Sequence, residues 1–403
     1  MSARYDAVVV GGRVAGASTA LLLARAGARV ALLERSPRGS DTVSTHALMR
    51  GGVLQLSRWG LLPDLLRAGT PPIRRTLFHY LGDPPVQVSI RHSPGVDALY
   101  APRRHVLDTL LVDAAAAAGV HVVHGMTATA LLHHQGRVCG VVARGRNGTE
   151  LQWRGDVVVG ADGVRSMVAR STAAAVEHRA AVSGSVLYRY FDDLPVAGYE
   201  WAYGEGAAAG MIPTNDGLTC VFVATRPERL RQLRRLGAES ALTALVHTAA
   251  PALAVRVRSG APVGRVHGWS GIRGFLRRAG GPGWALVGDS GYFKDPISTH
   301  GMTDALRDAE LLAGALLGAW SGSVPEALAL RRYQAQRDRL SQGLFTATDR
   351  IAAYDWDLPS VQGLLREVSA AMSDETELLQ ALPPHRERSG AGSRSTDTLV
   401  LRR

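Results

Sequence analysis

Short apolar runs alternate with a helical pattern at the start of the chain. Residues 7–10 are apolar and end at Gly11, residues 15–26 have helical composition, and residues 28–33 are apolar again. A short apolar run bounded by glycine is typical of a buried strand. The order strand, glycine-rich turn, helix, strand predicts a parallel βαβ unit.

Strand patterns and helical patterns then alternate along the chain. A helix is expected over 103–118, a hairpin or small meander over 120–143, and a strand-rich block from 181 to 223. An apolar run at 284–287 ends in Gly-Asp, and a helical segment follows from 301 to 320. Because a strand that returns so late must rejoin the first sheet, we expect an α/β domain that is interrupted by a second, strand-rich domain.

The charge of the chain is positive but scattered. It has 46 Lys+Arg against 35 Asp+Glu, a formal net charge of +11, and its single lysine is Lys294. A nucleic-acid partner would require clustered basic residues. The arginines lie singly among alanine-rich and glycine-rich runs, so we expect no nucleic-acid partner.

Neither cysteines nor apolar stretches indicate export or a membrane. Cys139 and Cys220 are far apart in the chain, which favours no disulfide framework and a reducing compartment. Arg25 and Arg29 interrupt the most apolar early segment, which is too short for the roughly 18 to 20 residues of a membrane span. The first residues leave no room for a secretion signal. We therefore expect a soluble, cytoplasmic chain that is large enough, at 403 residues, for two lobes.

The first candidate site is the turn after the first strand. It reads Gly11-Gly12-Arg13-Val14-Ala15-Gly16, and Glu34 closes the second strand. A helix that starts in such a turn presents free N–H groups to a pyrophosphate, and an acidic residue at this distance accepts hydrogen bonds from ribose hydroxyls. The alternative is a purely structural βα turn.

Arg13 departs from the dinucleotide fingerprint, which has glycine at this position. Its side chain adds bulk where the backbone should approach the phosphates. Two interpretations stay open: a guanidinium that turns outward to a phosphate or a cofactor ring, and a solvent-facing arginine in a wider turn.

Two further motifs make the predicted nucleotide site more specific. The run from Asp156 to Ser166 carries Asp162-Gly163 after a buried strand, and the run from Ala285 to Ser290 carries Gly288-Asp289 after another. Together with the N-terminal turn, they resemble the three signatures of the FAD-dependent aromatic hydroxylases (group A flavoprotein monooxygenases). This superfamily also includes geranylgeranyl reductase-like enzymes and flavin-dependent halogenases. The resemblance covers residues 5 to 320.

The resemblance implies an α/β fold with a Rossmann-like FAD-binding domain, a ββα three-layer sandwich, beside a β-sheet substrate domain and a helical C-terminus. The FAD-binding domain would consist of residues 1–75, 103–180 and 276–322. The substrate domain would consist of residues 76–102 and 181–275, followed by helices over 323–380 and a disordered tail over 381–403.

The resemblance also implies a set of FAD-binding residues. They are Gly11, Gly12, Arg13, Ala15, Gly16, Glu34, Arg35, Arg50, Arg104, Asp162, Gly163, Gly288, Asp289, Gly301 and Met302. Glu34 would bind the adenosine ribose, Asp162-Gly163 would serve FAD and NAD(P)H, and Asp289 would hold the ribityl chain. Helix capping is the alternative for Asp162 and Asp289, and surface solvation is the alternative for Arg104.

Pro296 and His46 are the residues expected nearest to the chemistry. The segment from Asp295 to Met302 should lie against the flavin, with the next helix pointing its N-terminus at the pyrimidine edge. His46 follows Ser44-Thr45, which are good helix N-caps, so a structural first-turn role is the alternative. The loop departs from the family pattern at Ser290-Gly291-Tyr292, and at Thr299 and Thr303.

Aromatic residues on the central strands are candidates for the substrate wall. The proposed members are Tyr188, Tyr190, Trp201, Tyr203 and Met211. Alternation along a strand sends Tyr188 and Tyr190 to one face and Arg189 to the other. The alternative is that these side chains are plain core.

The resemblance favours a monooxygenase that uses NAD(P)H and O2 on a small aromatic or polyketide-like molecule. A reductase or oxidase on the same fold is the alternative, as is a flavoprotein without catalysis. A halogenase is disfavoured, because the family's halogenases depend on a lysine beside the substrate and the only lysine lies next to the flavin loop. No metal ligand set is expected, and the sequence leaves the oligomeric state and the choice between NADPH and NADH open.

Overall fold

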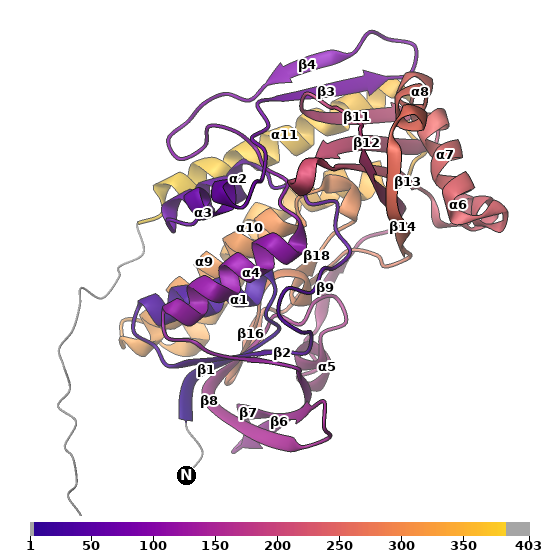
Figure 1. Cartoon of the computed structure of the whole chain (residues 1–403). Helices are drawn as coiled ribbons and strands as arrows, with labels where there is room; N and C mark the ends of the chain where they lie inside the picture. The colour runs from indigo at the N-terminus through magenta and orange to yellow at the C-terminus, as the bar shows by residue number, and fades with distance from the viewer. Residues whose placement is uncertain (1–3, 384–403) are drawn as a thin grey trace, which may run out of the picture.

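The computed structural model describes residues 4–383 (Figure 1). Its first sheet has eight strands in the order β16-β17-β8-β1-β2-β5, and the hairpin β6-β7 joins it through β8. The strands are β1 (Arg4–Val10), β2 (Val30–Glu34), β5 (His121–His124), β6 (Met126–His134), β7 (Arg137–Gly145), β8 (Glu150–Gly160), β16 (Gly280–Gly281) and β17 (Trp284–Leu286).

The central strands of this sheet are parallel. β1 pairs with β2 and β8, β2 pairs with β5, and β8 pairs with β17. Their apolar runs are almost wholly buried, which is typical of a parallel sheet covered on both faces. Because parallel strands end at the same edge, the residues that follow them, Gly11, Ala161 and Gly288, lie together at that edge.

Helices cover one face of the first sheet and a β meander covers the other. α1 (Val14–Arg25), α4 (Arg104–Ala117) and α9 (Gly301–Trp320) pack against Ala7 and Val9. Strands β6 and β7 and the short helix α5 (Met167–Ser171) pack against Val8 and Val10. The alternation of β1 thus feeds two separate cores, and the predicted α/β class with a three-layer domain is confirmed.

The second sheet has seven strands in the order β14-β10-β13-β12-β11-β3-β4. They are β3 (Arg75–Tyr80), β4 (Val86–Ser89), β10 (Ser185–Asp192), β11 (Tyr199–Gly204), β12 (Ala207–Pro213), β13 (Thr219–Thr225) and β14 (Ala261–Ser270). One face packs on α7 (Ala238–Ala249) and α8 (Pro251–Ser259). The other face packs on α10 (Glu326–Ile351) and α11 (Leu358–Ala381), which lie between this sheet and the first domain (Figure 1).

Short elements complete the fold. A three-stranded sheet consists of β9 (Val176–Arg179), β15 (Phe275–Arg277) and β18 (Tyr292–Phe293). The remaining helices are α2 (Arg50–Arg58), α3 (Leu62–Arg67) and α6 (Pro227–Leu233), with 3-10 turns η1 (Asn215–Gly217), η2 (Arg234–Leu236), η3 (Gly288–Ser290) and η4 (Pro296–Ser298).

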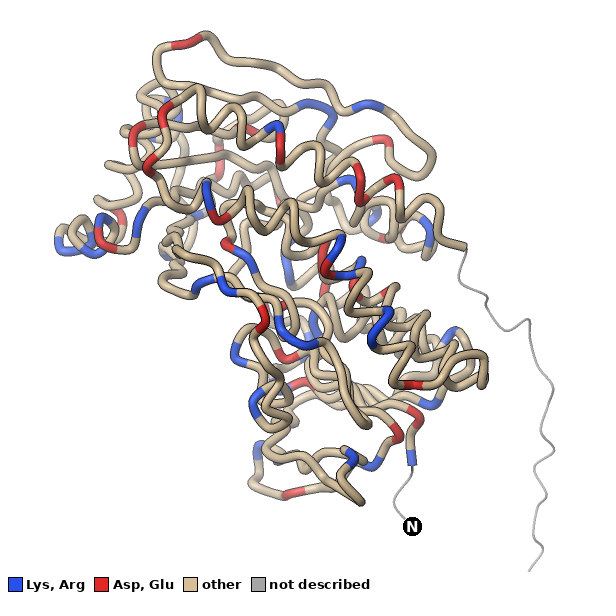
Figure 2. The backbone as a smooth tube through the Cα atoms, turned by 180° about the vertical axis from the view of Figure 1, so that it is seen from behind, with Lys and Arg blue, Asp and Glu red and all other residues tan. Residues whose placement is uncertain are grey.

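Two properties of the whole chain bear on its surroundings. Within residues 4–383, none of the helices combines the length and the hydropathy of a membrane span. Basic and acidic residues are interspersed along the backbone (Figure 2). The predicted disordered tail falls mainly on residues 384–403, which lie outside the described residues.

Candidate functional site

The glycines of the first turn are required by close backbone contacts. A Cβ on Gly16 would lie 1.8 Å from the carbonyl oxygen of Gly11, and a Cβ on Gly11, which has φ +106°, would lie 2.3 Å from the carbonyl oxygen of Ala161. The N-cap residue Arg13 is extended and its side chain makes no capping hydrogen bond. The turn therefore leaves the first N–H groups of α1 free of a side-chain cap, as binding of a phosphate requires.

Glu34 anchors this turn from the end of β2. Its buried carboxylate accepts hydrogen bonds from the backbone N–H groups of Gly12 (2.7 Å) and Ser36 (2.8 Å). A carboxylate has about four lone-pair sites, so Glu34 retains acceptor capacity for a further donor. Arg35, the next residue, is exposed.

Arg13 reaches away from the turn toward α4. Its guanidinium donates to the carbonyl oxygen of Ser40 (2.6 Å) and to Asp108 (2.8 Å). Asp108 is buried and also accepts from Arg104 (3.1 Å). Two predicted cofactor residues, Arg13 and Arg104, therefore meet at one carboxylate that the sequence analysis did not single out.

Asp162 caps a helix. Its carboxylate accepts from the Ser166 hydroxyl (2.5 Å) and from the Met167 N–H (2.6 Å) at the start of α5. Gly163, which has φ +77°, allows the turn between them. The capping alternative thus describes what Asp162 does within the chain.

Gly288 and Asp289 are pressed against the first turn. Gly288 has φ +59°, and a Cβ on it would lie 2.8 Å from the Cβ of Ala15. Ser290 lies within hydrogen-bond distance of the carbonyl oxygens of Gly160 and Val287 (2.8 Å). Ser290 therefore fastens the ends of β8 and β17 to each other.

Asp289 is the unpaired acid of the site. It has no hydrogen bond within residues 4–383, and its side chain is exposed. Burial among protein atoms nevertheless raises its pKa to about 6, while Lys294 and Arg104 act in the opposite direction. Asp289 is therefore a carboxylate that a ligand can reach, set among protein atoms that disfavour its charge.

These residues fit FAD. The uncapped N-terminus of α1 suits a pyrophosphate, and the unpaired Asp289 carboxylate suits a chain of hydroxyl donors beside it. Both lie at the edge where the parallel strands end, which is where open α/β sheets bind nucleotides.

The loop after Asp289 is tied to the second domain. Asp295 accepts from the N–H groups of Ile297 (3.0 Å) and Gly184 (2.6 Å), and Gly184 precedes β10. Pro296 is half-buried in this loop, and Gly301, the first residue of α9, is exposed with open space around it. Met302, the second residue of α9, is buried in the core of the first domain. The start of α9 is thus exposed at Gly301, whereas His300 and Thr303 beside it are buried.

His46 lies beside the second sheet in a strained conformation. Its φ is 68°, it is 1% exposed, and its Nε2 forms a hydrogen bond with the Tyr190 hydroxyl. Its Nδ1 is buried without a partner. Burial, with a smaller contribution from Arg103, lowers the pKa of His46 to about 3 against the opposing effect of Asp41, so the imidazole is neutral. The Nδ1 atom therefore keeps one unused hydrogen-bonding position in the interior of the protein.

Two aromatic clusters line one face of the second sheet. Tyr188 stacks on His267 with ring centroids 4.9 Å apart, and Arg103 lies 4.0 Å above the Tyr190 ring. Trp201 packs with Tyr199 and Phe222, whereas Tyr203 packs with Tyr80 and Trp356. Arg103 and His267 were not predicted from the sequence. For His267 the available signal was alternation along β14, which pairs with β10.

The structure does not bring all predicted residues together. Tyr188 and Tyr190 share a face and Arg189 pairs with Glu239 on the other, as alternation predicts. Met211 packs on that other face with α7, away from the four aromatic residues. Arg50 donates to the carbonyl oxygen of Arg91 (2.6 Å) and to Ser93 (2.7 Å), not to the glycine-rich turn.

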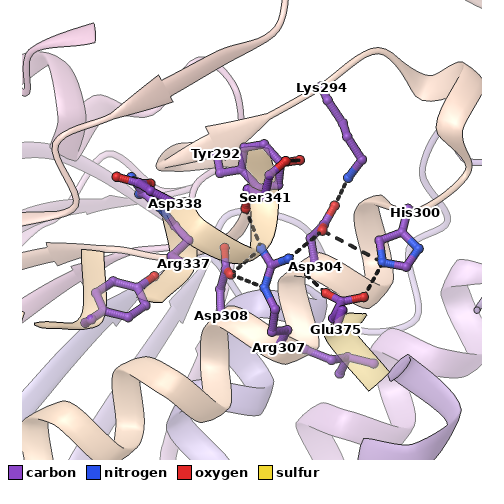
Figure 3. A network of polar contacts seen from close by, with 12 residues as sticks. Tyr292, Lys294, His300, Asp304, Arg307, Asp308, Arg337, Asp338, Ser341 and Glu375 are labelled. Carbon is purple, nitrogen blue, oxygen red and sulfur yellow. Dashed lines mark hydrogen bonds and ion pairs between the residues drawn. The ribbon is translucent and has the colours of Figure 1, made fainter. Parts of the chain in front are cut away.

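Within residues 4–383, two cavities and one acidic cluster lie outside this arrangement. A cavity of about 330 Å³ opens between α9 and α10 beside Leu311 and Tyr333. A cavity of about 200 Å³ opens between β10 and helices α7 and α8, on the face of the sheet opposite His46. His300, Asp304 and Glu375 bring their ligand atoms within 4.8 Å of one another (Figure 3). We assign no metal to them, because Lys294 and Arg307 already neutralise the two carboxylates.

Comparison with known proteins identifies the family of the chain. The model of the FAD binding domain matches residues 4–348. Digeranylgeranylglycerophospholipid reductase 2 of Methanothermobacter thermautotrophicus is 37% identical over 169 residues, 41% of each chain. The 6-methylpretetramide 4-monooxygenase of Streptomyces rimosus is 34% identical over 168 residues, 41% of this chain and 40% of that one. The match therefore spans about two fifths of either relative.

One solved structure has a similar fold over almost the whole chain. The structure titled "pqsL, a probable FAD-dependent monooxygenase from Pseudomonas aeruginosa" superposes with a TM-score of 0.77 at 21% identity. The superposition covers 90% of this chain and 100% of that one. The architecture described above is therefore shared along almost the whole chain.

Proposed function

The chain belongs to the FAD binding domain family, and from that premise we propose that it is a monooxygenase that uses NAD(P)H and O2 to oxygenate a small aromatic or polyketide-like molecule. That it is an FAD-dependent oxidoreductase follows from the family and from relatives that are oxidoreductases. The proposal adds the reaction and the kind of substrate.

The proposal depends on one observation. An unpaired carboxylate and two helix N-termini lie at one edge of the first sheet, and the loop beside them is bonded to the sheet that carries the aromatic face. Asp289 and the starts of α1 and α9 lie at one edge of the first sheet, and Asp295 ties the same loop to β10 of the second. Such an arrangement presents a cofactor site and an aromatic wall to each other.

The residues of the site would bind FAD and stabilise its charge. When bound, FAD supplies the electron transfer and the activation of oxygen, for which side chains have no equivalent. The start of α1 would hold the pyrophosphate and Asp289 the ribityl hydroxyls. The start of α9 would stabilise negative charge on the ring system.

The wall suits a flat substrate with hydroxyl groups. On this face lie Tyr188, Tyr190 with the Arg103 guanidinium above its ring, and His46, whose Nδ1 has no partner. These three ring residues are at most 6% exposed, so the proposed substrate would contact them after local opening of the face. Aromatic rings stack on such surfaces, and a buried phenol needs one polar partner. The named substrate of the Streptomyces rimosus relative supports the choice of a polyketide-like class.

An isotope experiment tests the proposal. The FAD-loaded protein is incubated with NADPH or NADH under ¹⁸O2 and a panel of phenolic and polycyclic aromatic compounds. We expect oxidation of the nicotinamide to accelerate with one compound class, and the product to gain one ¹⁸O atom. His46→Gln should lower this turnover at least tenfold, whereas Met211→Leu, on the opposite face of the sheet, should leave it within twofold.

The same experiment separates the alternatives. A reductase, which the Methanothermobacter relative favours, would add two hydrogens to its substrate, incorporate no ¹⁸O and run without oxygen. Nicotinamide oxidation without ¹⁸O in any product would favour an oxidase, and absence of nicotinamide oxidation with every compound would favour a flavoprotein without catalysis. Either result would refute the monooxygenase.

A further inference from the structure

The cavity beside β10 lies behind the aromatic face, on the side of the second sheet that α7 and α8 cover. Its volume of about 200 Å³ is several times the ~30 Å³ that a water molecule occupies in the liquid, so it has room for a small organic molecule. Most of its lining is apolar, with Phe191 from β10, Leu242 and Val246 from α7, and Ala254 and Val257 from α8. Such walls favour a ligand with a hydrocarbon body.

A guanidinium interrupts this apolar wall. Arg189 of β10 lines the cavity, and its side chain is 16% exposed. Its one ion-pair partner within residues 4–383 is Glu239 (2.8 Å), which lies in the first turn of α7 and is 71% exposed. The Nε atom of Arg189 is buried and has no partner in the same part of the chain. A guanidinium has five N–H donors and an exposed carboxylate pairs weakly, so Arg189 can bind a second acceptor.

Glu200 shows how a second charge on the same face of the sheet is satisfied. Strand register places Glu200 and Arg189 in one row across β10, β13, β12 and β11. The Glu200 carboxylate accepts two hydrogen bonds from Arg256 of α8 (2.7 and 2.9 Å) and forms a third with His79 (2.9 Å). Buried polar groups are normally paired in this way. Arg189 is therefore the incompletely paired charge of the row.

The sheet is irregular beside Arg189. The register between β10 and the edge strand β14 shifts between Tyr188 and Tyr190, the two neighbours of Arg189. Residues 264–266 of β14 consequently lie opposite Arg189 alone, and Val266 of this segment lines the cavity. Bulges of this kind are over-represented next to functional sites. The interrupted pairing and the incompletely paired guanidinium thus coincide at one wall of the cavity.

The charges around the cavity select the kind of ligand. Its lining contains two guanidiniums, those of Arg189 and the exposed Arg258, and one carboxylate, that of Glu239. The cavity therefore has one positive charge in excess, which matches a ligand with one negative charge. Among monoanions, a carboxylate fits the planar donor geometry of a guanidinium.

We propose that this cavity is a second binding site, which takes an amphipathic monocarboxylate. The apolar body would lie between Phe191 and the two helices, and the carboxylate would bind Arg189. Tyr188 and Tyr190 point to the opposite face of the sheet, so this ligand would not compete with the substrate of the proposed reaction. The inference goes beyond the proposed function and holds whichever reaction the chain catalyses.

Calorimetric titration of the FAD-loaded protein with octanoate tests the proposal. The matched probes are 1-octanol, which has no charge, and octylamine, which is positively charged. We expect octanoate to saturate one site with a Kd below about 1 mM, and each matched probe to bind at least tenfold more weakly. Octanoate that does not saturate a site in this range, or a matched probe that binds within tenfold of octanoate, would overturn the proposal.

Two variants and two controls locate the site. Arg189→Met removes the cation but keeps a long apolar chain, and Thr243→Trp places a large side chain at the cavity from an exposed position of α7. Each should weaken octanoate binding at least tenfold. His46→Gln, on the opposite face, and the exposed change Arg235→Met should leave the Kd within twofold. A smaller effect of either variant, or loss of binding in His46→Gln, contradicts the proposal; if Arg189→Met does not fold, Thr243→Trp decides.

Discussion

The replacement Gly16→Ala is the sharpest test of the glycine-rich turn. Gly16 is buried in the first turn of α1, and its new Cβ would lie 1.8 Å from the Gly11 carbonyl oxygen and 3.0 Å from the Ala161 Cβ. Ordinary contact begins near 3.4 Å, so the turn must move by more than 1 Å. Both neighbours are held by strands β1 and β8, which leaves little room for that movement.

The expected cost combines two opposing effects. Forcing an extra methyl group into a packed site destabilises a protein by about 1–3 kcal/mol, and a clash with backbone lies at the upper end. Alanine in place of glycine within a helix returns about 1 kcal/mol. We therefore expect Gly16→Ala to lower the free energy of unfolding by about 2 kcal/mol and to weaken FAD binding at least tenfold, because the displaced turn no longer presents its N–H groups.

Urea denaturation and the quenching of FAD fluorescence measure these two effects. Gly314→Ala is the matched control: this glycine lies in α9 with nothing within 4 Å of its added Cβ. The control should gain up to about 1 kcal/mol in stability and bind FAD as the wild type does. The reasoning is refuted if Gly16→Ala unfolds within 0.5 kcal/mol of the control, a figure near the usual scatter of about ±0.5 kcal/mol for neutral changes, and binds FAD equally well.

Three further predictions concern charged side chains. The pKa of Asp289 is about 6, so its carboxylate is protonated and accepts hydrogen bonds less well below that pH. FAD affinity should therefore fall as the pH decreases through 6, and Asp289→Asn should bind FAD weakly at every pH. Fluorescence titrations with FAD from pH 5 to 8 check both expectations. The pKa of His46 is about 3 in the folded chain and 6.5 when exposed, so the unfolded chain binds more protons below pH 6.5 and stability should fall there by up to about 1.4 kcal/mol per pH unit. In His46→Gln this slope should be smaller in urea denaturation at pH 5 and 7, and an unchanged slope would exclude His46 as its source. Arg13→Gly removes a partly exposed ion pair but leaves Asp108 with Arg104, so unfolding experiments should give a loss of about 1–2 kcal/mol; retained FAD affinity and turnover would show that the arginine acts on the turn alone.

Much of the first domain could be predicted because its signals are local. A glycine-rich turn, the strand before it and the helix after it are adjacent in the sequence, and an apolar run that ends in Gly-Asp indicates a buried strand wherever it occurs. The local patterns predicted the α/β class, and the family resemblance that three such motifs carry implied FAD.

The faces of the second sheet depended on register. Alternation within β10 correctly separated Arg189 from Tyr188 and Tyr190. Met211 was grouped with the aromatic residues of the preceding strand, but it pairs with Glu200 across the β11–β12 hairpin and therefore shares the face of Glu200. A shift of one residue in the turn exchanges the faces of a strand, and the sequence of the turn does not fix that parity.

The sequence by itself determined the parts that short-range geometry controls: the turn that only glycine permits, the parallel strands, and the presence of a single lysine beside the flavin loop. Only the tertiary structure decided which charges meet. Asp108 accepts hydrogen bonds from both Arg13 and Arg104, and the Tyr190 hydroxyl forms a hydrogen bond with Nε2 of His46. Glu375, which lies 68 residues after Arg307 in the chain, is a buried ion-pair partner of Arg307. The physical reason is that a buried charge is stable only when paired, and its partner is chosen by how helices and sheets pack, not by distance along the chain.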